Sequence, residues 1–171
     1  TYAYGALASG GDILWAEALL ECGAELHVVL PFALAEFRET SVAAAGGDWV
    51  GRFERCLAAA SAVSYATEDA YLHDDVLYRY GSELAMGLAI LRAGYLEADV
   101  RQLALWDGGP PLGAASTAID VATWRRRGLE TTIVTPRGEL LSEASNFPEP
   151  SVMTGSSSGR IVCAMLFADV K

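Results

Sequence analysis

Short runs of β-branched and aromatic residues alternate with longer segments of helical periodicity along most of this 171-residue chain. This alternation predicts parallel strands joined by right-handed helical crossovers. Residues 25–30 are almost wholly apolar, which is typical of a strand buried on both faces of a parallel sheet. We therefore expect an α/β fold, with helices on both faces of a mostly parallel sheet.

The periodicity places these elements in a Rossmann-like three-layer sandwich. The expected strands span residues 2–5, 25–30, 62–66, 100–106 and 131–135. The expected helices span residues 12–22, 49–60, 74–96 and 117–127, with a short helical turn at 34–38. In the longest helix we expect the three- and four-residue steps to form the core-facing stripe, made of Leu77, Tyr80, Leu84, Leu88, Leu91 and Tyr95.

Composition excludes some classes of partner. The formal charge of −10 and the pI near 4.5 argue against a nucleic-acid-binding surface, because phosphate backbones select basic patches. The three cysteines are far apart and form no C-x-x-C pair, which indicates reduced thiols and a cytoplasmic location. The apolar stretches fall short of the roughly 20 residues that cross a bilayer, so no membrane contact is evident.

The composition changes after residue 135. Ser, Gly, Pro and Glu dominate residues 136–159, and 155–159 read Gly-Ser-Ser-Ser-Gly, a linker composition. The apolar strand that follows ends in an acid. We therefore expect one α/β domain over 1–141, a flexible linker over 142–159, and one extra strand over 160–171 that belongs to another domain.

The loop after the first expected strand is a candidate ligand site. Ligands of open α/β sheets bind at the carboxyl ends of the strands. Glycines let backbone amides approach a ligand closely, and a helix N-terminus follows. The candidate binding residues are Gly5, Ser9, Gly10, Gly11 and Asp12. The alternative is that the glycines only make the turn and Asp12 caps the helix; its charge also disfavours phosphate there.

A second loop at the same sheet edge follows the fourth expected strand. Asp107, Gly108, Gly113 and Thr117 offer glycines, hydroxyls and another helix N-terminus, and would complete the same pocket. The alternative is a capping box, in which Thr117 caps the helix and Asp120 returns a hydrogen bond to it.

Several blocks resemble the N-terminal Rossmannoid domain of some bacterial class III adenylate/guanylate cyclases. They lie at residues 4–14, 23–32, 37–42, 65–68 and 105–108. They also resemble the SLOG group, which unites DprA-like and LOG-like folds and is proposed to sense or process nucleotide-derived ligands. The resemblance implies a small nucleotide-like effector. Family domains begin with one more strand and helix, so we expect this domain to be truncated at its N-terminus.

The last residues resemble the opening strand of the cyclase catalytic domain. Phe167-Ala168-Asp169-Val170 matches its Phe-x-Asp-Ile/Val segment. The resemblance implies that Asp169 helps to hold Mg²⁺ or Mn²⁺ in a parent enzyme that converts ATP or GTP and works as a homodimer. One carboxylate cannot complete such a site. The expected function is a nucleotide-sensing regulatory region of a cyclase, in a piece that lacks a complete catalytic site.

Two other functions stay open. LOG-type phosphoribohydrolases carry a Pro-Gly-Gly-x-Gly-Thr-x-x-Glu segment whose Glu serves N-glycosidic hydrolysis. Here only Thr117-Ala118-Ile119-Asp120 matches its end, with Asp in place of Glu. In this second hypothesis Asp120 acts in a nucleotide N-glycosidase. The third is a non-catalytic interaction module without a small-molecule pocket.

Overall fold

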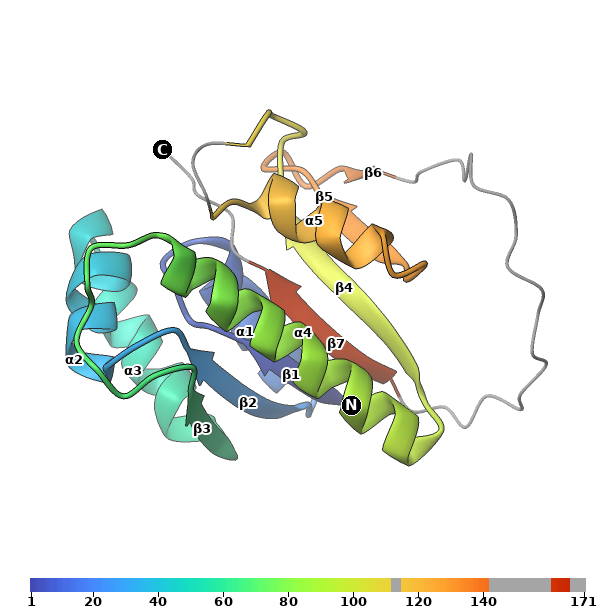
Figure 1. The fold of residues 1–171 in the computed structure, drawn as a ribbon, viewed down its shortest axis with the longest axis horizontal. Coiled ribbons are helices and arrows are strands. Elements are labelled where there is room, and N and C mark those ends of the chain that lie inside the picture. Colours follow the sequence, from blue (N-terminus) through green and yellow to red (C-terminus); the bar gives the residue numbers. More distant parts are fainter. Residues whose placement is uncertain (112–114, 142–160, 167–171) are drawn as a thin grey trace.

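The computed structural model describes residues 1–111, 115–141 and 161–166, where strands and helices alternate as expected (Figure 1). The strands are β1 (Tyr2–Gly5), β2 (Glu25–Leu30), β3 (Ala62–Tyr65), β4 (Asp99–Leu105), β5 (Thr131–Val134), β6 (Leu140–Leu141) and β7 (Ile161–Leu166). The α-helices are α1 (Gly11–Glu21), α2 (Leu34–Phe37), α3 (Trp49–Ala59), α4 (Val76–Leu96) and α5 (Thr117–Arg125). A π-helix, η1 (Arg38–Val42), and a 3₁₀-helix, η2 (Ala43–Ala45), follow α2.

The described strands form one sheet in the order β3-β2-β1-β7-β4-β5-β6. Every neighbouring pair is parallel except β5 and β6, which are antiparallel. The chain builds outward from β1 to β3 on one side, and from β4 to β6 on the other. The strand order thus reverses around β7, and open α/β sheets bind ligands at the carboxyl edge of such a point.

Helices cover both faces of the sheet, which confirms the predicted three-layer α/β fold. Helices α1 and α3 pack on one face, and α4 and α5 lie on the other (Figure 1). Successive residues of β1 show the two faces: Ala3 belongs to the apolar cluster under α1 and α3, and Tyr4 belongs to the cluster under α4. No described helix combines the length and apolar character that crossing a membrane requires.

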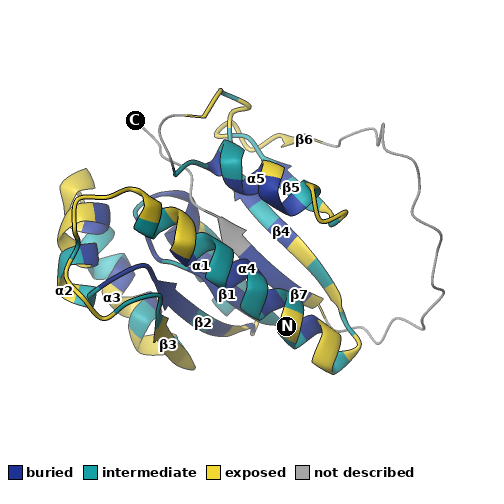
Figure 2. Cartoon of the chain, viewed as in Figure 1, coloured by how far each residue is buried: buried dark blue, intermediate teal, exposed yellow. Residues whose placement is uncertain are grey.

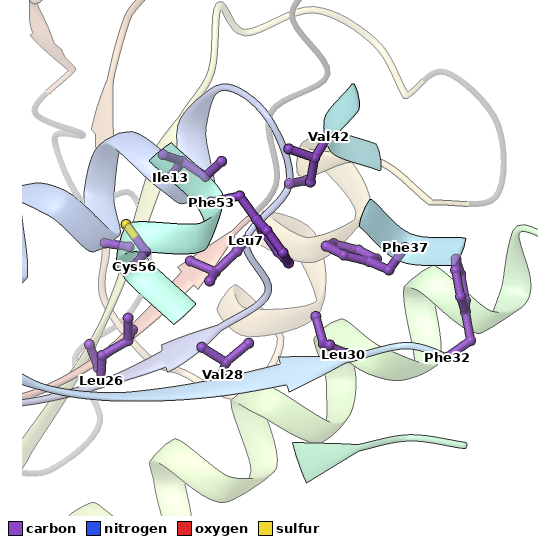
Figure 3. Close-up of a cluster of buried hydrophobic side chains, with 13 residues drawn as sticks. Leu7, Ile13, Leu26, Val28, Leu30, Phe32, Phe37, Val42, Phe53 and Cys56 are labelled. Carbon is purple, nitrogen blue, oxygen red and sulfur yellow. The ribbon is translucent and has the colours of Figure 1, made fainter. Parts of the chain in front are cut away.

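The larger apolar cluster fills the space between β1, β2, α1 and α3 and reaches α2 and η1 (Figure 3). Aromatic rings continue it toward the carboxyl edge. The ring centroids of Phe37 and Phe53 lie 6.4 Å apart, and those of Phe32 and Phe37 lie 6.0 Å apart. These three side chains are at most 1% exposed. The cluster therefore fixes α2, and with it the start of η1, over the end of β2.

Helix α4 corrects the predicted core stripe. Its buried residues are small or flexible: Gly81, Ala85, Met86, Ala89 and Ala93. Of the longer side chains that we expected in the core, Tyr80, Leu91 and Tyr95 turn outward and are 55%, 67% and 88% exposed. The other three are partly buried, and Leu77 and Leu88 pack against the two apolar clusters as expected. Figure 2 shows the exposed and half-buried positions on the outward side of this helix. Small inward residues let the helix backbone lie close to the sheet. The face that carries them is therefore buried, although the opposite face carries larger apolar side chains.

Strand β7 corrects the predicted domain division at residue 160. It pairs with β1 on one side and β4 on the other, at the centre of this sheet rather than in a second domain. Val162, Cys163 and Ala164 are all buried, as expected for a parallel strand covered on both faces. The predicted linker over 142–159 lies outside the described residues.

Substitutions at two glycines of α4 test the close packing of this helix. A Cβ atom on Gly81 would lie 3.0 Å from Pro31 Cβ, whereas a Cβ on Gly87 would meet nothing within 4 Å. Both alanine variants gain about 0.5–1 kcal/mol of helix propensity. We expect Gly87→Ala to be stabilised in urea unfolding, and Gly81→Ala to be about 1 kcal/mol or more less stable than Gly87→Ala. Equal stabilities would contradict the close contact.

Neighbouring substitutions in β7 test its central position. Val162 is fully buried, and Ile161 is 41% exposed. Val162→Asp would bury an unpaired carboxyl group, so we expect a loss of about 3–5 kcal/mol in the free energy of unfolding. Ile161→Asp should cost about 1 kcal/mol or less. Two equally small losses in chemical unfolding would show that this strand is not in the sheet.

Candidate functional site

The loop between β1 and α1 forms one wall of a cavity at the carboxyl edge of the sheet. Gly10 precedes α1 with φ of 100°, a conformation that side chains other than glycine's rarely adopt. Ser9 fastens the loop to η1, because its backbone N–H and its hydroxyl both donate to the Ser41 carbonyl oxygen, at 2.9 and 3.0 Å. The glycine and the serine thus fix the path that carries the chain into the first turn of α1.

Asp12, in that first turn, is buried with an unused acceptor. Its side chain is 1% exposed, and Oδ2 accepts a 3.3 Å hydrogen bond from the Ala8 backbone N–H. Within the described part of the chain, Oδ1 has no hydrogen-bond partner, although Asp12 lines the cavity. Because a buried carboxylate oxygen without a donor is costly, this atom is suited to accept a hydrogen bond from a ligand.

Asp120 lies in the first turn of α5 and lines the same cavity. Asp120 is 3% exposed, and the Ser82 hydroxyl of α4 donates a hydrogen bond to its carboxylate. The buried Gln102 of β4 holds this turn, since its Nε2 donates to the Asp120 carbonyl oxygen at 3.3 Å. The Thr131 hydroxyl donates to Gln102 Oε1 at 2.7 Å. These contacts connect β4, β5 and α4 to the position of Asp120.

The cavity has a volume of about 410 Å³, within the range of small-molecule sites. Its described lining residues come from the loops before α1 and α5, the first turns of these two helices, the end of β2, α2, η1, η2, and α4 with the residue before it. They are Ala6, Ser9, Asp12, Val29, Pro31, Phe37, Thr40, Ser41, Ala44, Ala45, Asp75, Tyr78, Gly81, Ser82, Ala85, Ala115, Ser116 and Asp120. The apolar part of the lining consists of Val29, Pro31, Phe37, five alanines and Gly81, and the polar part consists of hydroxyl and carboxyl groups.

Hydroxyl groups of η1 and α4 are connected at the rim. The Ser41 hydroxyl donates to the Tyr78 phenol oxygen at 3.2 Å, and Thr40 Oγ1 lies 3.3 Å from the same oxygen. The Thr40 hydroxyl also donates to the Glu36 carbonyl oxygen at 2.8 Å. This network ties the π-helix, which the sequence did not predict, to α4 across the cavity.

Burial shifts the proton affinity of both carboxyl groups. Desolvation raises the pKa of Asp12 to about 7, against the lowering effect of the Ala8 hydrogen bond and with a further increase from the charge of Asp120. Desolvation also raises the pKa of Asp120 to about 7, although the Ser82 hydrogen bond lowers it; Glu83 raises it and Arg79 lowers it. Both groups therefore exchange protons near neutral pH, as general acids and bases do.

Asp12 does not cap α1, which was the alternative to its role in a ligand site. Gly10 occupies the N-cap position of α1, and the Asp12 carboxylate accepts from Ala8 instead. Ser9 and Asp12 line the cavity, whereas Gly5, Gly10 and Gly11 shape the buried loop behind them. Ligand binding by this loop stays a prediction.

The second predicted loop contributes less than the sequence indicated. Asp107 is exposed, and its Oδ1 accepts a 2.8 Å hydrogen bond from the Gly109 N–H, which closes a local turn. Neither Asp107 nor Gly108 lines the cavity. Thr117 is buried, with no hydrogen-bond partner for Oγ1 in the described structure, and stands just beside the lining residue Ser116. Gly113 lies outside the described residues.

The capping-box interpretation of Thr117 and Asp120 is wrong. Ser116 is the N-cap of α5, and it makes no side-chain capping hydrogen bond. Asp120 instead interacts with Ser82 of α4. The site predicted from the sequence did not include η1, η2 or the first half of α4, which also line the cavity. The block at residues 37–42 carried a partial signal, since it was one of the segments on which the family resemblance rested.

The predicted metal ligand Asp169 lies outside the described residues. In the part that the structure describes, no group of three or more His, Cys, Asp or Glu side chains is arranged to hold a metal ion. The described site therefore consists of carboxyl, hydroxyl and apolar groups.

Comparisons with known proteins identify no relative. No protein family matches the chain, and neither the curated proteins nor the solved structures contain a match. What the structure establishes is an α/β domain of Rossmann-like kind, and its functional interpretation depends on the cavity.

The pH dependence of stability tests the burial of Asp12. Folding raises its pKa from 3.8 to about 7, so the folded protein binds more protons than the unfolded chain in this window. Rising pH therefore costs the wild type stability between about pH 4 and pH 7, and Asp12→Asn lacks that contribution. Between pH 5 and pH 8, we expect the free energy of unfolding of the wild type, measured in urea, to fall by on the order of 2 kcal/mol relative to that of Asp12→Asn.

The matched control for this measurement is Asp99→Asn, which changes an exposed carboxyl at the start of β4. Its stability difference from the wild type should stay nearly constant over the same range. A constant difference for Asp12→Asn as well would contradict the burial of its carboxyl group.

Proposed function

We propose that this chain is a sensor domain that binds a small nucleoside-like effector in the cavity at the carboxyl edge of its sheet. The observation that carries the proposal is the unpartnered Oδ1 of Asp12, buried in a cavity where the strand order reverses. Ligands of open α/β sheets bind at this position. A small molecule that donates a hydrogen bond would satisfy the buried acceptor.

The lining suits a molecule with one flat apolar part and one part rich in hydroxyl groups. The apolar part of the lining, which includes five alanines beside the buried Val29, Pro31 and Phe37, suits a ring. Asp12 and Asp120 are acceptors for ribose hydroxyl groups. Small-molecule sites commonly combine such an apolar wall with a few polar groups that set orientation.

The wider role that we propose is regulatory. The resemblance of residues 4–134 to cyclase-associated sensor domains supports effector binding that modulates a class III adenylate or guanylate cyclase. That enzyme would act on ATP or GTP as a homodimer, and Asp169 would serve its Mg²⁺ or Mn²⁺ site.

A second candidate function is N-glycosidic hydrolysis. The specific observation in its favour is that Asp12 and Asp120 both have pKa values raised to about 7 by burial in one cavity. Such a carboxyl group can protonate a departing base near neutral pH. This function predicts release of free base from a nucleoside or nucleotide, and Asp120→Asn should abolish it; binding without release would favour the sensor.

The binding function is tested by blocking the cavity. Ala44 and Ala43 are neighbours in η2, and both are exposed, but only Ala44 lines the cavity. We expect a panel of nucleosides and nucleotides to contain a molecule that raises the melting temperature of the wild type. A ligand at 100 times its Kd should add about 2.7 kcal/mol to the free energy of unfolding.

Ala44→Trp should remove that stabilisation, since the indole would fill the cavity mouth, and Ala43→Trp should keep it. Stabilisation that persists in Ala44→Trp would place binding elsewhere. If no member of the panel stabilises the wild type, the interaction-module alternative is favoured.

A further inference from the structure

We propose that the cavity selects the unphosphorylated nucleoside and rejects the corresponding nucleotide, because its wall is acidic where Rossmann-like sites usually receive phosphate. This inference rests on the proposed function, since it specifies the chemical class of the effector. It narrows the nucleotide-like effector that the family resemblance implies to one without a phosphate group.

The helix N-termini at this edge already face carboxyl groups of the chain itself. A helix N-terminus attracts anions, and phosphate commonly binds there. Asp12 occupies the first turn of α1, and Asp120 occupies the first turn of α5. Both residues are at most 3% exposed. The favourable field of each helix is thus directed at an internal carboxylate, and an incoming phosphate would compete with that group.

The charges around the cavity have one sign. Asp12, Asp75 and Asp120 line it, and no Lys, Arg or His stands among its described lining residues. The nearby Arg79 pairs with Glu83 through a 2.9 Å contact on the exposed surface. A phosphate ester carries between one and two negative charges at neutral pH. Above about pH 7, where Asp12 and Asp120 are ionised, a phosphate ester would therefore meet repulsion from the wall without a compensating cation from these residues.

The same groups favour a ribose. Asp12 Oδ1 and Ser116 Oγ are buried atoms without hydrogen-bond partners in the described structure, and both residues line the cavity. A ribose hydroxyl can donate to the first and either donate to or accept from the second. A buried polar group that gains its missing partner only from the correct ligand discriminates strongly against ligands that cannot supply it.

Calorimetric titration of the full chain at pH 8, where both carboxyl groups are mostly ionised, with adenosine, AMP, guanosine and GMP tests the inference. For at least one base, the nucleoside should bind at least tenfold more tightly than its monophosphate. The double variant Asp12→Asn, Asp120→Asn keeps the side-chain shape and removes both charges, so the ratio of the two affinities should fall at least fivefold. Asp99→Asn, at the opposite edge of the sheet, should leave the ratio unchanged.

The outcomes separate this inference from the proposed function. A monophosphate that binds as tightly as its nucleoside, or more tightly, overturns the inference and leaves the sensor function standing. Failure of all four molecules to bind counts against the proposed function itself. Should the double variant fail to fold, the affinity ratio in the wild type still decides the preference. A wild-type preference that persists in a folded double variant would contradict the assigned cause.

Discussion

Desolvation of two carboxyl groups governs the carboxyl edge of this sheet. Asp12 and Asp120 enter from helices on opposite faces, α1 and α5, and both are withdrawn from water in one cavity. Burial raises the pKa of each to about 7, so their charged forms destabilise the fold at and above neutral pH. Single hydrogen bonds from Ala8 and Ser82 offset this cost only in part. Residues that serve stability alone are seldom placed in this way, which is why we propose that the pair binds a ligand.

Close packing of α4 makes this arrangement possible. Gly81 lets the helix approach Pro31 at the end of β2, and Ser82 on the next position reaches Asp120. Tyr78, one turn earlier, contacts the hydroxyl groups of η1. The first half of one helix therefore connects both walls of the cavity. Substitutions that lift α4 from the sheet would alter Asp120 and η1 together, even without touching either of them.

Local sequence patterns predicted the elements that depend on local physics. The apolar run of β2 and the periodicity of α3 gave the strand and helix nearly at their observed bounds, and the loop of Ser9 and Asp12 was placed at the correct edge. The patterns did not predict properties set by tertiary packing. The buried face of α4 depends on how closely its small residues approach the sheet, and the π-helix contacts α4 through the hydrogen bond from Ser41 to Tyr78, which are distant in sequence.

The position of β7 shows the same limit. Composition marked residues 142–159 as a boundary, but pairing with β1 and β4 places the strand beyond them at the centre of the same sheet. Asp120 shows it at the level of a single side chain. Its spacing from Thr117 suggested a local cap, whereas Ser82, which is distant in sequence, provides its hydrogen bond.

The titration of the Asp12 and Asp120 carboxyl carbons by nuclear magnetic resonance tests this account most directly. Each signal can be assigned by its loss in the corresponding asparagine variant. The account predicts midpoints near pH 7 for both groups in the ligand-free protein. Midpoints near 4, as in exposed aspartates, would show that the carboxyl groups remain in water and that the acidic cavity described above does not form.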